Sequence, residues 1–531
     1  MRVGESTTAL WVEEAPGEKG LELGKTHNLR RAAMALDGTL IPAGAVFSFW
    51  RQLGRATRGR GFVEGRMLQE GCLMPAVGGG LCQLSNALYD VALDAGCRIV
   101  ERHGHSRIVP NSAAAYGRDA TVAWNYVDFR FAADRDLKLS AWLDRDSLIV
   151  ELHARSADGP TTPHIPLTEV GETREARSCA SCGETHCHMH ARVNEAPVST
   201  GRVAFLVDED WPEFRSHVAS AQAAGDLIGL PLDGARLGLK RYRWDTQGFA
   251  DVVQAPMAAL ERSIAWRRIP PEGPARRAAE ARTSARIAHA LAAQLGPEVA
   301  TLTVAQSLLP FLWREGWLGG RRFSVLMTRL PIAELHALLD AAFAAHPDRK
   351  SLADYRAPAW IAQAEAEALA AAEEIITPHA ALAALFAPRS LKLDWAAPAR
   401  LAPARRGDVI AFPGPVLARK GADAVRDAAR RTGLAVRPLG RPLEDAAFWD
   451  GVTLDPVPAS GDWLDGVAVV VQPALVQDAP RRLLEALAAG VPVIASPACG
   501  LDPQAGLSLV APDDPDALTE ALLPFATRAA L

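Results

Sequence analysis

The sequence contains no run of about 18 consecutive apolar residues, the length that a membrane-spanning helix requires. Its N-terminus, MRVGESTTALWVEEAPGEKG, has no apolar core of the kind that a secretory signal peptide carries. A net charge of −5 over 531 residues provides no strongly basic surface, which argues against a nucleic-acid partner. Only seven cysteines are present, and their odd number favours metal or catalytic use over a disulfide framework. We therefore expect a cytoplasmic protein without a transmembrane segment, with peripheral membrane contact left open.

Length and composition predict a multidomain globular protein. A chain of 531 residues is too long for one core and predicts about three domains at roughly 150 residues each. The contents of 49% apolar and 22% charged residues are typical of globular proteins. The basic cluster Arg276–Arg286 alternates with Glu and Ala and predicts a solvated helix face.

The periodicity predicts four segments. Residues 24–155 predict an α+β domain, with a helix over Gln83–Ala95 and several antiparallel strands, one of them over Ala120–Tyr126. Residues 156–200 form a polar connector that carries a Cys/His cluster. Residues 201–400 predict a helix-rich α/β domain, with a strand over 203–207, another over 374–376, and a helix that starts at Thr377-Pro378. Strand and helix alternate from residue 401 to 531, which predicts a Rossmann-type parallel sheet with ligands at the carboxyl ends of its strands.

The stretch VGGGLCQLSNALYDVALDAGCRIVERHGHS, residues 77–106, is the most informative part of the sequence. Its three consecutive glycines allow a sharp turn that brings Cys82 into the first turn of a helix, where the helix dipole favours the thiolate. His105 follows one helix and one strand later, and Asp119 is available to orient the imidazole. Gln83 and nearby N–H groups are candidates for holding an oxyanion. The pattern predicts a catalytic Cys82–His105–Asp119 site, and the alternative is that Cys82 is a small buried residue.

Five motifs in this region resemble those of the VanW family. They are Asn28-Leu-Arg-Arg-Ala-Ala, Pro42-Ala-Gly-Ala-Val-Phe-Ser-Phe49, Gly78-Gly-Gly-Leu-Cys-Gln-Leu-Ser85, Glu101-Arg-His-Gly-His-Ser106 and Gly117-Arg-Asp-Ala-Thr-Val122. The resemblance covers roughly residues 24–155 and implies that Cys82, His103, His105 and Asp119 are important, without naming a reaction. It also connects the chain with the cell envelope and with the glycopeptide-antibiotic resistance for which the family is named.

The connector holds a dense group of soft metal ligands, RSCASCGETHCHMH. Cys179 and Cys182 have the C-x2-C spacing that places two thiolates on one metal, and Cys187 and His190 follow. His186 or His188 can replace His190 in a Cys3His set. We predict a metal site, with zinc favoured, an iron–sulfur cluster as the rival, and an uncoordinated loop as the alternative to both.

Residues 409–421, VIAFPGPVLARKG, predict a strand, a glycine turn and a helix start with a lysine, which suits a diphosphate. Glu485, on a later helix, is placed to accept hydrogen bonds from ribose hydroxyls. The alternative is a plain Rossmann-like domain with an ordinary surface glutamate, because glycine patterns alone are weak signals.

This combination resembles the donor half of GT-B glycosyltransferases of the retaining, nucleotide-sugar-using kind. Gly414, Lys420 and Gly421 match the family's first loop, and Glu485 matches the second residue of its Glu-x7-Glu pair, which holds the ribose. The block EALAAGVPV from residue 485 to 493 also matches, and the resemblance is good over roughly 365–531 and faint over 201–364.

The chain departs from the GT-B pattern at three places. Pro415 replaces a phosphate-binding Arg, for which Arg419 is a substitute, and Gln477 replaces the first Glu, which contacts the donor sugar. No glycine-rich loop follows the strand at 203–207, where Asp208-Glu-Asp stands instead.

Three functions compete. The first is glycosyl transfer from a nucleotide-sugar to an envelope-related or glycoconjugate acceptor. The second is a thiol-dependent enzyme centred on Cys82 and His105 beside a degenerate sugar-binding module, and the third is a non-catalytic scaffold. We favour the first, with Arg419 and Lys420 on the diphosphate, Glu485 on the ribose and Gln477 on the donor sugar.

Overall fold

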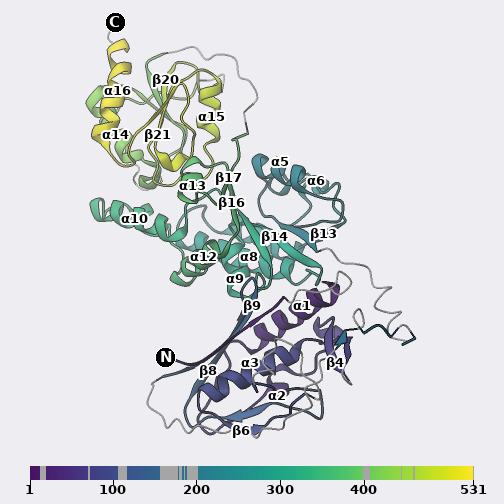
Figure 1. Ribbon diagram of the computed structural model, residues 1–531. Helices are drawn as coiled ribbons and strands as arrows, with labels where there is room; N and C mark the ends of the chain where they lie inside the picture. The colour runs from purple at the N-terminus through teal and green to yellow at the C-terminus, as the bar shows by residue number, and fades with distance from the viewer. Residues whose placement is uncertain are drawn as a thin grey trace.

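The computed structural model describes residues 1–11, 19–69, 72–105, 117–155, 177–178, 182–184, 186–187, 201–396, 398, 407–443, 445, 447–458 and 461–529. These residues form an N-terminal domain (residues 2–154), a middle domain (202–392) and a C-terminal domain (409–529), and the middle domain lies between the other two (Figure 1).

The N-terminal domain is α+β. Its main sheet is antiparallel in the order β1-β9-β8-β2, and helices α1 and α3 pack on it. Alternate residues of β8 are buried, so one face of the strand supplies the core and the other is more exposed. Two smaller sheets, β3-β7-β6 and β10-β5-β4, complete the domain. The elements are β1 (Arg2–Ala9), α1 (Lys19–Leu36), β2 (Leu40–Ile41), β3 (Val46–Ser48), α2 (Phe49–Leu53), η2 (Arg58–Arg60), β4 (Glu64–Gln69), β5 (Cys72–Val77), α3 (Leu81–Asp94), β6 (Arg98–Glu101), β7 (Arg130–Ala132), β8 (Leu137–Leu143), β9 (Ser147–Ala154) and, from the connector, β10 (Arg177–Ser178).

The structure differs from the sequence prediction at two places in this domain. Strand β1 lies before the predicted start of the domain and pairs with β9 from Arg2 to Ala9. Its sequence, RVGESTTA, has too few apolar residues to predict a strand. The predicted strand over Ala120–Tyr126 is wrong. That segment forms only an isolated bridge between Ala123 and Val127, closed by Asn125 with a φ of 76°, a left-handed conformation that asparagine tolerates.

The middle domain is a parallel sheet in the order β13-β12-β11-β14-β15-β16-β17. Ala204 and Leu206 of β11 join one hydrophobic core, and Phe205 and Val207 join another, so the sheet is covered on both faces. The elements are β11 (Arg202–Leu206), α5 (Pro212–Ala221), β12 (Leu227–Leu230), α6 (Gly234–Leu237), η4 (Lys240–Tyr242), β13 (Asp251–Gln254), α7 (Pro256–Arg268), α8 (Pro274–Ala292), β14 (Val299–Ala305), α9 (Leu309–Arg314), β15 (Arg322–Leu326), α10 (Ile332–Ala345), α11 (Lys350–Asp354), α12 (Ala359–Ala371), β16 (Glu374–Thr377), α13 (Ala380–Leu385) and β17 (Ser390–Lys392).

The C-terminal domain repeats this architecture at smaller size, with a parallel sheet in the order β19-β18-β20-β21-β22. The strands of its centre are buried throughout, as expected for a sheet with helices on both faces. The predicted doubly wound sheet is present. The elements are β18 (Val409–Phe412), η5 (Ala418–Lys420), α14 (Ala422–Thr432), β19 (Val436–Pro438), β20 (Val467–Gln472), α15 (Arg481–Ala488), β21 (Val493–Ala495), η6 (Pro497–Cys499), β22 (Leu507–Leu509) and α16 (Pro515–Ala529).

Arginine side chains connect the three domains. Arg30 of α1 donates from Nε to the carbonyl oxygen of Gly319 at 2.6 Å, which joins the N-terminal and middle domains. Between the middle and C-terminal domains, Arg481 donates two hydrogen bonds to the carboxylate of Glu213, at 2.5 and 2.7 Å. In the part of the chain that the structure describes, no helix is long and apolar enough to span a membrane.

Candidate functional sites

A buried asparagine fixes the glycine loop ahead of Cys82. The Asn28 side chain, on α1, donates from Nδ2 to the carbonyl oxygens of Val63 and Gly79 at 3.0 and 2.9 Å and accepts from the Val63 N–H at 2.9 Å. A Cβ on Gly79 would lie 2.2 Å from the carbonyl oxygen of Gly65, so only glycine allows this close backbone contact. Gly80, with a φ of 97°, then caps the start of α3.

The structure brings Cys82, His105 and Asp119 together. Cys82 lies in the first turn of α3, and the His105 imidazole is close enough to its thiol to interact with it. Asp119 accepts from His105 twice, from the backbone N–H to Oδ2 and from Nδ1 to Oδ1, each at 2.5 Å. The side chains of His105 and Asp119 are only 12% and 13% exposed, so this ion pair is largely shielded from water. The arrangement is that of a thiol, a base and an orienting carboxylate.

Helix α3 also fixes the segment that carries Asp119. The N–H of Ala120 donates to the side chain of Asn86 at 2.7 Å, and the Ala120 carbonyl oxygen accepts from the Ser85 hydroxyl at 2.5 Å. The helix that carries the thiol therefore also positions the carboxylate that orients the base.

The electrostatics favour a charged Cys82–His105 pair. Burial raises the pKa of Cys82, but the hydrogen bond and the positive charge of His105 outweigh it, so the pKa of the thiol is lowered overall. Burial lowers the pKa of His105, whereas Asp119 and then Cys82 raise it, to about 10. The two protons are coupled, and both directions favour thiolate and imidazolium over the neutral pair.

Two other residues that the sequence singled out lie apart from this cluster. His103 is half exposed, and its Nε2 lies 3.4 Å from the carboxylate of Glu101. The Gln83 side chain donates from Nε2 to Thr8 Oγ1 and to the Ala9 carbonyl oxygen, at 2.9 and 2.8 Å, so its amide protons bind strand β1 instead of facing the thiol.

The predicted metal site falls mostly outside the described residues. Cys182 and Cys187 are described and partly exposed, whereas Cys179 and His190, together with the alternative ligand His188, lie outside the described part. The Glu184 N–H donates to the Cys182 sulfur at 3.4 Å. Among the described residues, no group of three or more His, Cys, Asp or Glu side chains is placed to hold a metal. Zinc at this connector remains a prediction.

Two loops of the C-terminal domain meet at the carboxyl ends of β18 and β20, where ligands of parallel sheets bind. The N–H groups of Leu475 and Val476, in the loop after β20, donate to the Arg419 carbonyl oxygen at 3.0 and 3.2 Å. A Cβ on Gly421, whose φ is 81°, would lie 2.3 Å from the Pro473 carbonyl oxygen, so the contact between the loops requires glycine.

Lys420 and Gln477 lie at the centre of these loops, beside Gly414. The Lys420 ammonium donates to the Val476 carbonyl oxygen at 2.6 Å and to Gln477 Oε1 at 2.9 Å, and burial lowers its pKa. Because an ammonium has three N–H donors, one remains for a ligand. A Cβ on Gly414 would lie 3.0 Å from the Gln472 amide nitrogen, so the backbone there is close to the same cluster.

Arg419 and Glu485, also predicted for the donor site, differ in their surroundings. The Arg419 guanidinium is buried, pairs with Glu272 of the middle domain and lies 4.8 Å from the centre of the Tyr355 ring. A phosphate at Arg419 would therefore compete with Glu272. Glu485, on α15, is partly exposed, and no described residue forms an ion pair or side-chain hydrogen bond with its carboxylate.

A cavity of about 350 Å³ opens at the carboxyl ends of the middle-domain strands. It is lined by Asp208 after β11, Ser307 after β14 and Arg329 after β15, together with Asp478 from the loop that carries Gln477. Asp478 comes from the C-terminal domain, so the cavity adjoins the Lys420–Gln477 cluster.

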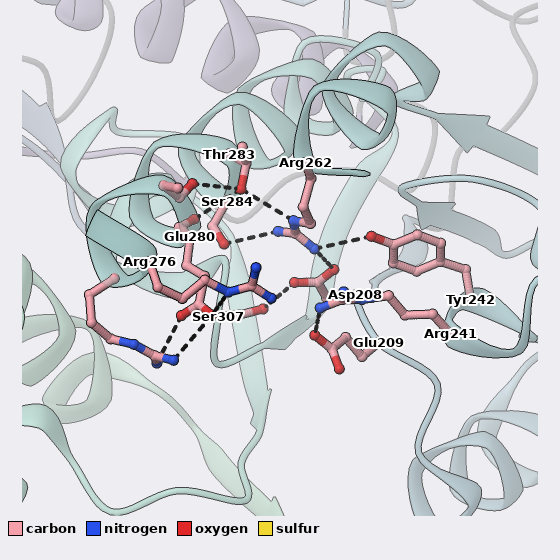
Figure 2. Close-up of polar contacts among 12 residues, drawn as sticks. Asp208, Glu209, Arg241, Tyr242, Arg262, Arg276, Glu280, Thr283, Ser284 and Ser307 are labelled. Atoms are coloured by element: carbon pink, nitrogen blue, oxygen red, sulfur yellow. Dashed lines mark hydrogen bonds and ion pairs between the residues drawn. The ribbon is translucent and has the colours of Figure 1, made fainter. Parts of the chain in front are cut away.

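Asp208 and Arg262 form a buried ion pair in the wall of this cavity (Figure 2). Arg262 Nη1 donates to Asp208 Oδ1 at 2.5 Å, and Arg262 also donates to Ser284 Oγ at 3.0 Å, while Ser307 Oγ donates to Asp208 Oδ2 at 2.8 Å. Burial lowers the pKa of Arg262, but Asp208 and then Tyr242 raise it by more than burial lowers it. The pKa is therefore raised overall, and the guanidinium stays charged. The Asp-Glu-Asp that replaces a glycine-rich loop thus supplies a structural carboxylate.

The predicted solvated face over Arg276–Arg286 is confirmed at Arg282 and Arg286, which are exposed, but is wrong at the start of α8. Arg276 and Arg277 are only 12% and 23% exposed, because their guanidinium groups lie over the rings of Trp266 and Tyr355, at 4.0 and 4.4 Å. The alternating charges do not reveal this, since they are equally compatible with stacking on aromatic rings.

In comparison with known proteins, the N-terminal and C-terminal parts of the chain match two different families. Residues 24–153 match the family described as VanW like protein, and residues 426–527 match Glycosyl transferases group 1. The vancomycin B-type resistance protein VanW of Enterococcus faecalis (strain ATCC 700802 / V583) is 36% identical over 137 residues, which are 24% of this chain and 49% of that protein. The uncharacterized protein YoaR of Bacillus subtilis (strain 168) is 39% identical over 107 residues, 20% of this chain and 35% of that protein. The chain thus spans half or less of the length of these relatives.

Residues 24–153 are a VanW domain. Cys82, His105 and Asp119 all lie inside it, as the resemblance implied. The glycosyl transferases group 1 region, 426–527, contains Gln477 and Glu485, whereas Lys420 and its loop precede the matched residues. With its two parallel sheets in successive domains, the chain downstream of the VanW domain has a GT-B-like architecture.

Among the solved structures that match, the following two each cover 62% of the chain. The sucrose-phosphate synthase of Thermosynechococcus elongatus matches at 14% identity, over 90% of its length, with a TM-score of 0.37. Alr3699/HepE of Anabaena, in complex with UDP, matches at 14% identity, over 93% of its length, with a TM-score of 0.34.

Proposed function

We propose that the GT-B-like half of the chain transfers a glycosyl group from a nucleotide-diphosphate sugar. The observation that carries this proposal is the meeting of the Lys420 loop and the Gln477 loop at the carboxyl ends of β18 and β20, directly beside a cavity of the middle domain. The match of residues 426–527 to Glycosyl transferases group 1 supports it.

Each predicted donor residue then has a physical role. Lys420 supplies its remaining N–H to the diphosphate, and Gly414 allows the phosphates to approach the backbone. Arg419 joins the diphosphate when it leaves Glu272. Glu485, whose carboxylate has no described partner, accepts hydrogen bonds from the ribose hydroxyls. Gln477 contacts the donor sugar as a neutral group, which supports binding but provides no charge for a cationic centre.

The acceptor, an envelope-related or glycoconjugate molecule, enters the cavity beside Asp208 and Asp478. The retaining stereochemistry comes from the GT-B pattern in the sequence. A cytoplasmic location follows from the supply of nucleotide-sugars, and zinc at Cys179, Cys182, Cys187 and His190 would hold the connector.

Calorimetric titration of the full chain with UDP, GDP and their common sugars tests the donor site. We expect binding in the micromolar range that is lost in Glu485→Ala and kept in Glu520→Ala, because Glu520 is an exposed glutamate on α16 of the same domain. Absence of binding to every nucleotide, or equal binding by both variants, would contradict the proposal and favour a non-catalytic scaffold.

A further inference from the structure

The VanW domain contains a second constellation that glycosyl transfer does not use. Asp119 binds the His105 imidazole, the imidazole interacts with the Cys82 thiol, and the Thr121 hydroxyl lies 3.6 Å from the same sulfur. We propose that this cluster is an acyl-transfer site, in which Cys82 attacks the carbonyl carbon of an ester or amide.

The geometry assigns one role to each residue. The Nδ1 of His105 is engaged by Asp119, which leaves Nε2 for the sulfur of Cys82. Asp119 also accepts from the His105 backbone N–H, so the ring cannot rotate away without losing two hydrogen bonds to one carboxylate. Asp119 is therefore a positioning residue, and Cys82 and His105 are the groups that touch the reacting atoms.

The position of Cys82 at the start of α3 provides a place for an oxyanion. The Gln83 N–H donates to the Gly80 carbonyl oxygen at 3.0 Å, so the N–H groups of Leu81 and Cys82 are those at the start of α3 that can meet an oxyanion. Helix α3, Leu81–Asp94, is long enough to add its dipole. The Thr121 hydroxyl lies 3.6 Å from the Cys82 sulfur and supplies a further polar group beside it.

Exposed aromatic side chains follow Val122 in the chain. The Val122 carbonyl oxygen lies 3.9 Å from the Cys82 sulfur, and the turn that follows exposes Trp124 and Tyr126, which are 42% and 81% accessible. Trp124 contacts Trp50 edge to face, with ring centres 5.5 Å apart. Large exposed aromatic side chains beside a buried charged pair suit a substrate with apolar or ring-shaped faces next to its carbonyl group.

The proposed step balances without any redox partner. An electron pair of the Cys82 thiolate forms the S–C bond, and the C=O π pair moves to the oxygen. When that pair returns, the C–N or C–O bond breaks, and the leaving amine or alcohol takes the proton from Nε2 of the His105 imidazolium. Water then attacks the thioester while His105 accepts its proton, which releases the acid and restores the thiolate.

Acylation of the full chain by p-nitrophenyl acetate tests the proposal. We expect a burst of one equivalent of p-nitrophenol, with the acetyl group found on Cys82 by peptide mass mapping. The burst should be absent in Cys82→Ala and at least about 100-fold slower in His105→Gln. Cys72→Ser is the matched control, since Cys72 is the exposed cysteine of β5, and it should leave the burst unchanged.

The Asp119→Asn variant separates positioning from mere stability. It should slow the burst and shift its pH dependence toward that of an ordinary thiol, while the circular dichroism spectrum and melting temperature stay close to those of the parent chain. A pH profile identical to the parent's would refute the positioning role.

A measurement on the unmodified chain guards against variants that do not fold. Iodoacetamide at neutral pH should alkylate Cys82 at least tenfold faster than the exposed Cys72. Faster reaction at Cys72, or acetylation there in preference to Cys82, would overturn the proposal. Failure of these assays with intact nucleotide binding would leave glycosyl transfer standing, and the converse also holds, so the two proposals fail separately.

Discussion

Replacing Asp208 with alanine is expected to destabilise the middle domain more than any comparable surface change. Arg262 and Asp208 are 3% and 5% exposed, so the variant leaves a guanidinium in the interior whose hydrogen-bond partners among the described residues are Thr283, Ser284 and Tyr242. Removing one partner of a buried ion pair costs about 3–5 kcal/mol.

Helices α7 and α8, which carry Arg262 and its partners Thr283 and Ser284, also contain an exposed ion pair that serves as the control. Glu261 of α7 pairs with Arg286 of α8, and their side chains are 32% and 63% exposed. Because water screens such a pair, Glu261→Ala should cost less than about 1 kcal/mol. The double variant Asp208→Ala/Arg262→Met should recover most of the loss, since it removes the uncompensated charge and keeps an apolar side chain in its place.

Native-state hydrogen exchange is the suitable assay, because a chain of several domains does not unfold in two states. A loss of about 3 kcal/mol corresponds to roughly a 100-fold fall in protection of the amides of β11 and α7. Protection that falls less than tenfold in Asp208→Ala, or no more than in Glu261→Ala, would show that water already reaches the pair and would refute the reasoning.

Three further predictions concern the VanW domain and the connector. His27 is 6% exposed, and burial, followed by the charge of Arg30, lowers its pKa from 6.5 to about 3, so the unfolded chain takes up a proton first as pH falls. Stability of the N-terminal domain should therefore be lost below pH 6.5, by about 2 kcal/mol at pH 5. Native-state hydrogen exchange at pH 6.5 and at pH 5 should show a smaller loss in His27→Gln. Asn28→Ala leaves the Val63 and Gly79 backbone groups without their partner, which should cost about 2–3 kcal/mol in native-state hydrogen exchange of α1 and slow alkylation of Cys82 as the glycine loop loosens. Unchanged alkylation would show that the glycine loop does not control the reactivity of the thiol. Elemental analysis should find about one zinc per chain, lost in Cys182→Ser and kept in Cys72→Ser, and a metal-free parent chain would remove the zinc site from consideration.

The sequence was most informative where local chemistry decides structure. The helix over Gln83–Ala95 and the strand over 409–412 are confirmed nearly residue by residue, because a glycine turn and a fully apolar run leave few alternatives. Most strands of the middle sheet escaped prediction. Strand β14, VATLTVA, follows the turn residues Gly296-Pro297, but it lies among Ala-rich helices that dominate the composition of this region.

Contacts between distant segments account for other failures. The helix predicted to start at Thr377-Pro378 begins later, because His379 caps α13 with its ring and Thr377 instead completes β16. For the candidate sites, the sequence selected Cys82, His105 and Asp119 from spacing and family motifs, but could not show that Gln83 turns toward β1. Nor could it reveal Arg262, whose partner is Asp208, 54 residues earlier in the chain.

Arg419 belongs to the C-terminal domain, but its ion-pair partner, Glu272, belongs to the middle domain. An anion bound to this guanidinium would repel the Glu272 carboxylate, so the occupancy of the loop and the strength of the link between the two domains are coupled. By reciprocity, a change that strengthens the Arg419–Glu272 ion pair lowers the affinity of Arg419 for the anion by the same factor. Arg481 with Glu213 and Arg349 with Asp423 meanwhile keep the domains joined. A ligand smaller than either domain could thus set how freely one half of the protein moves against the other.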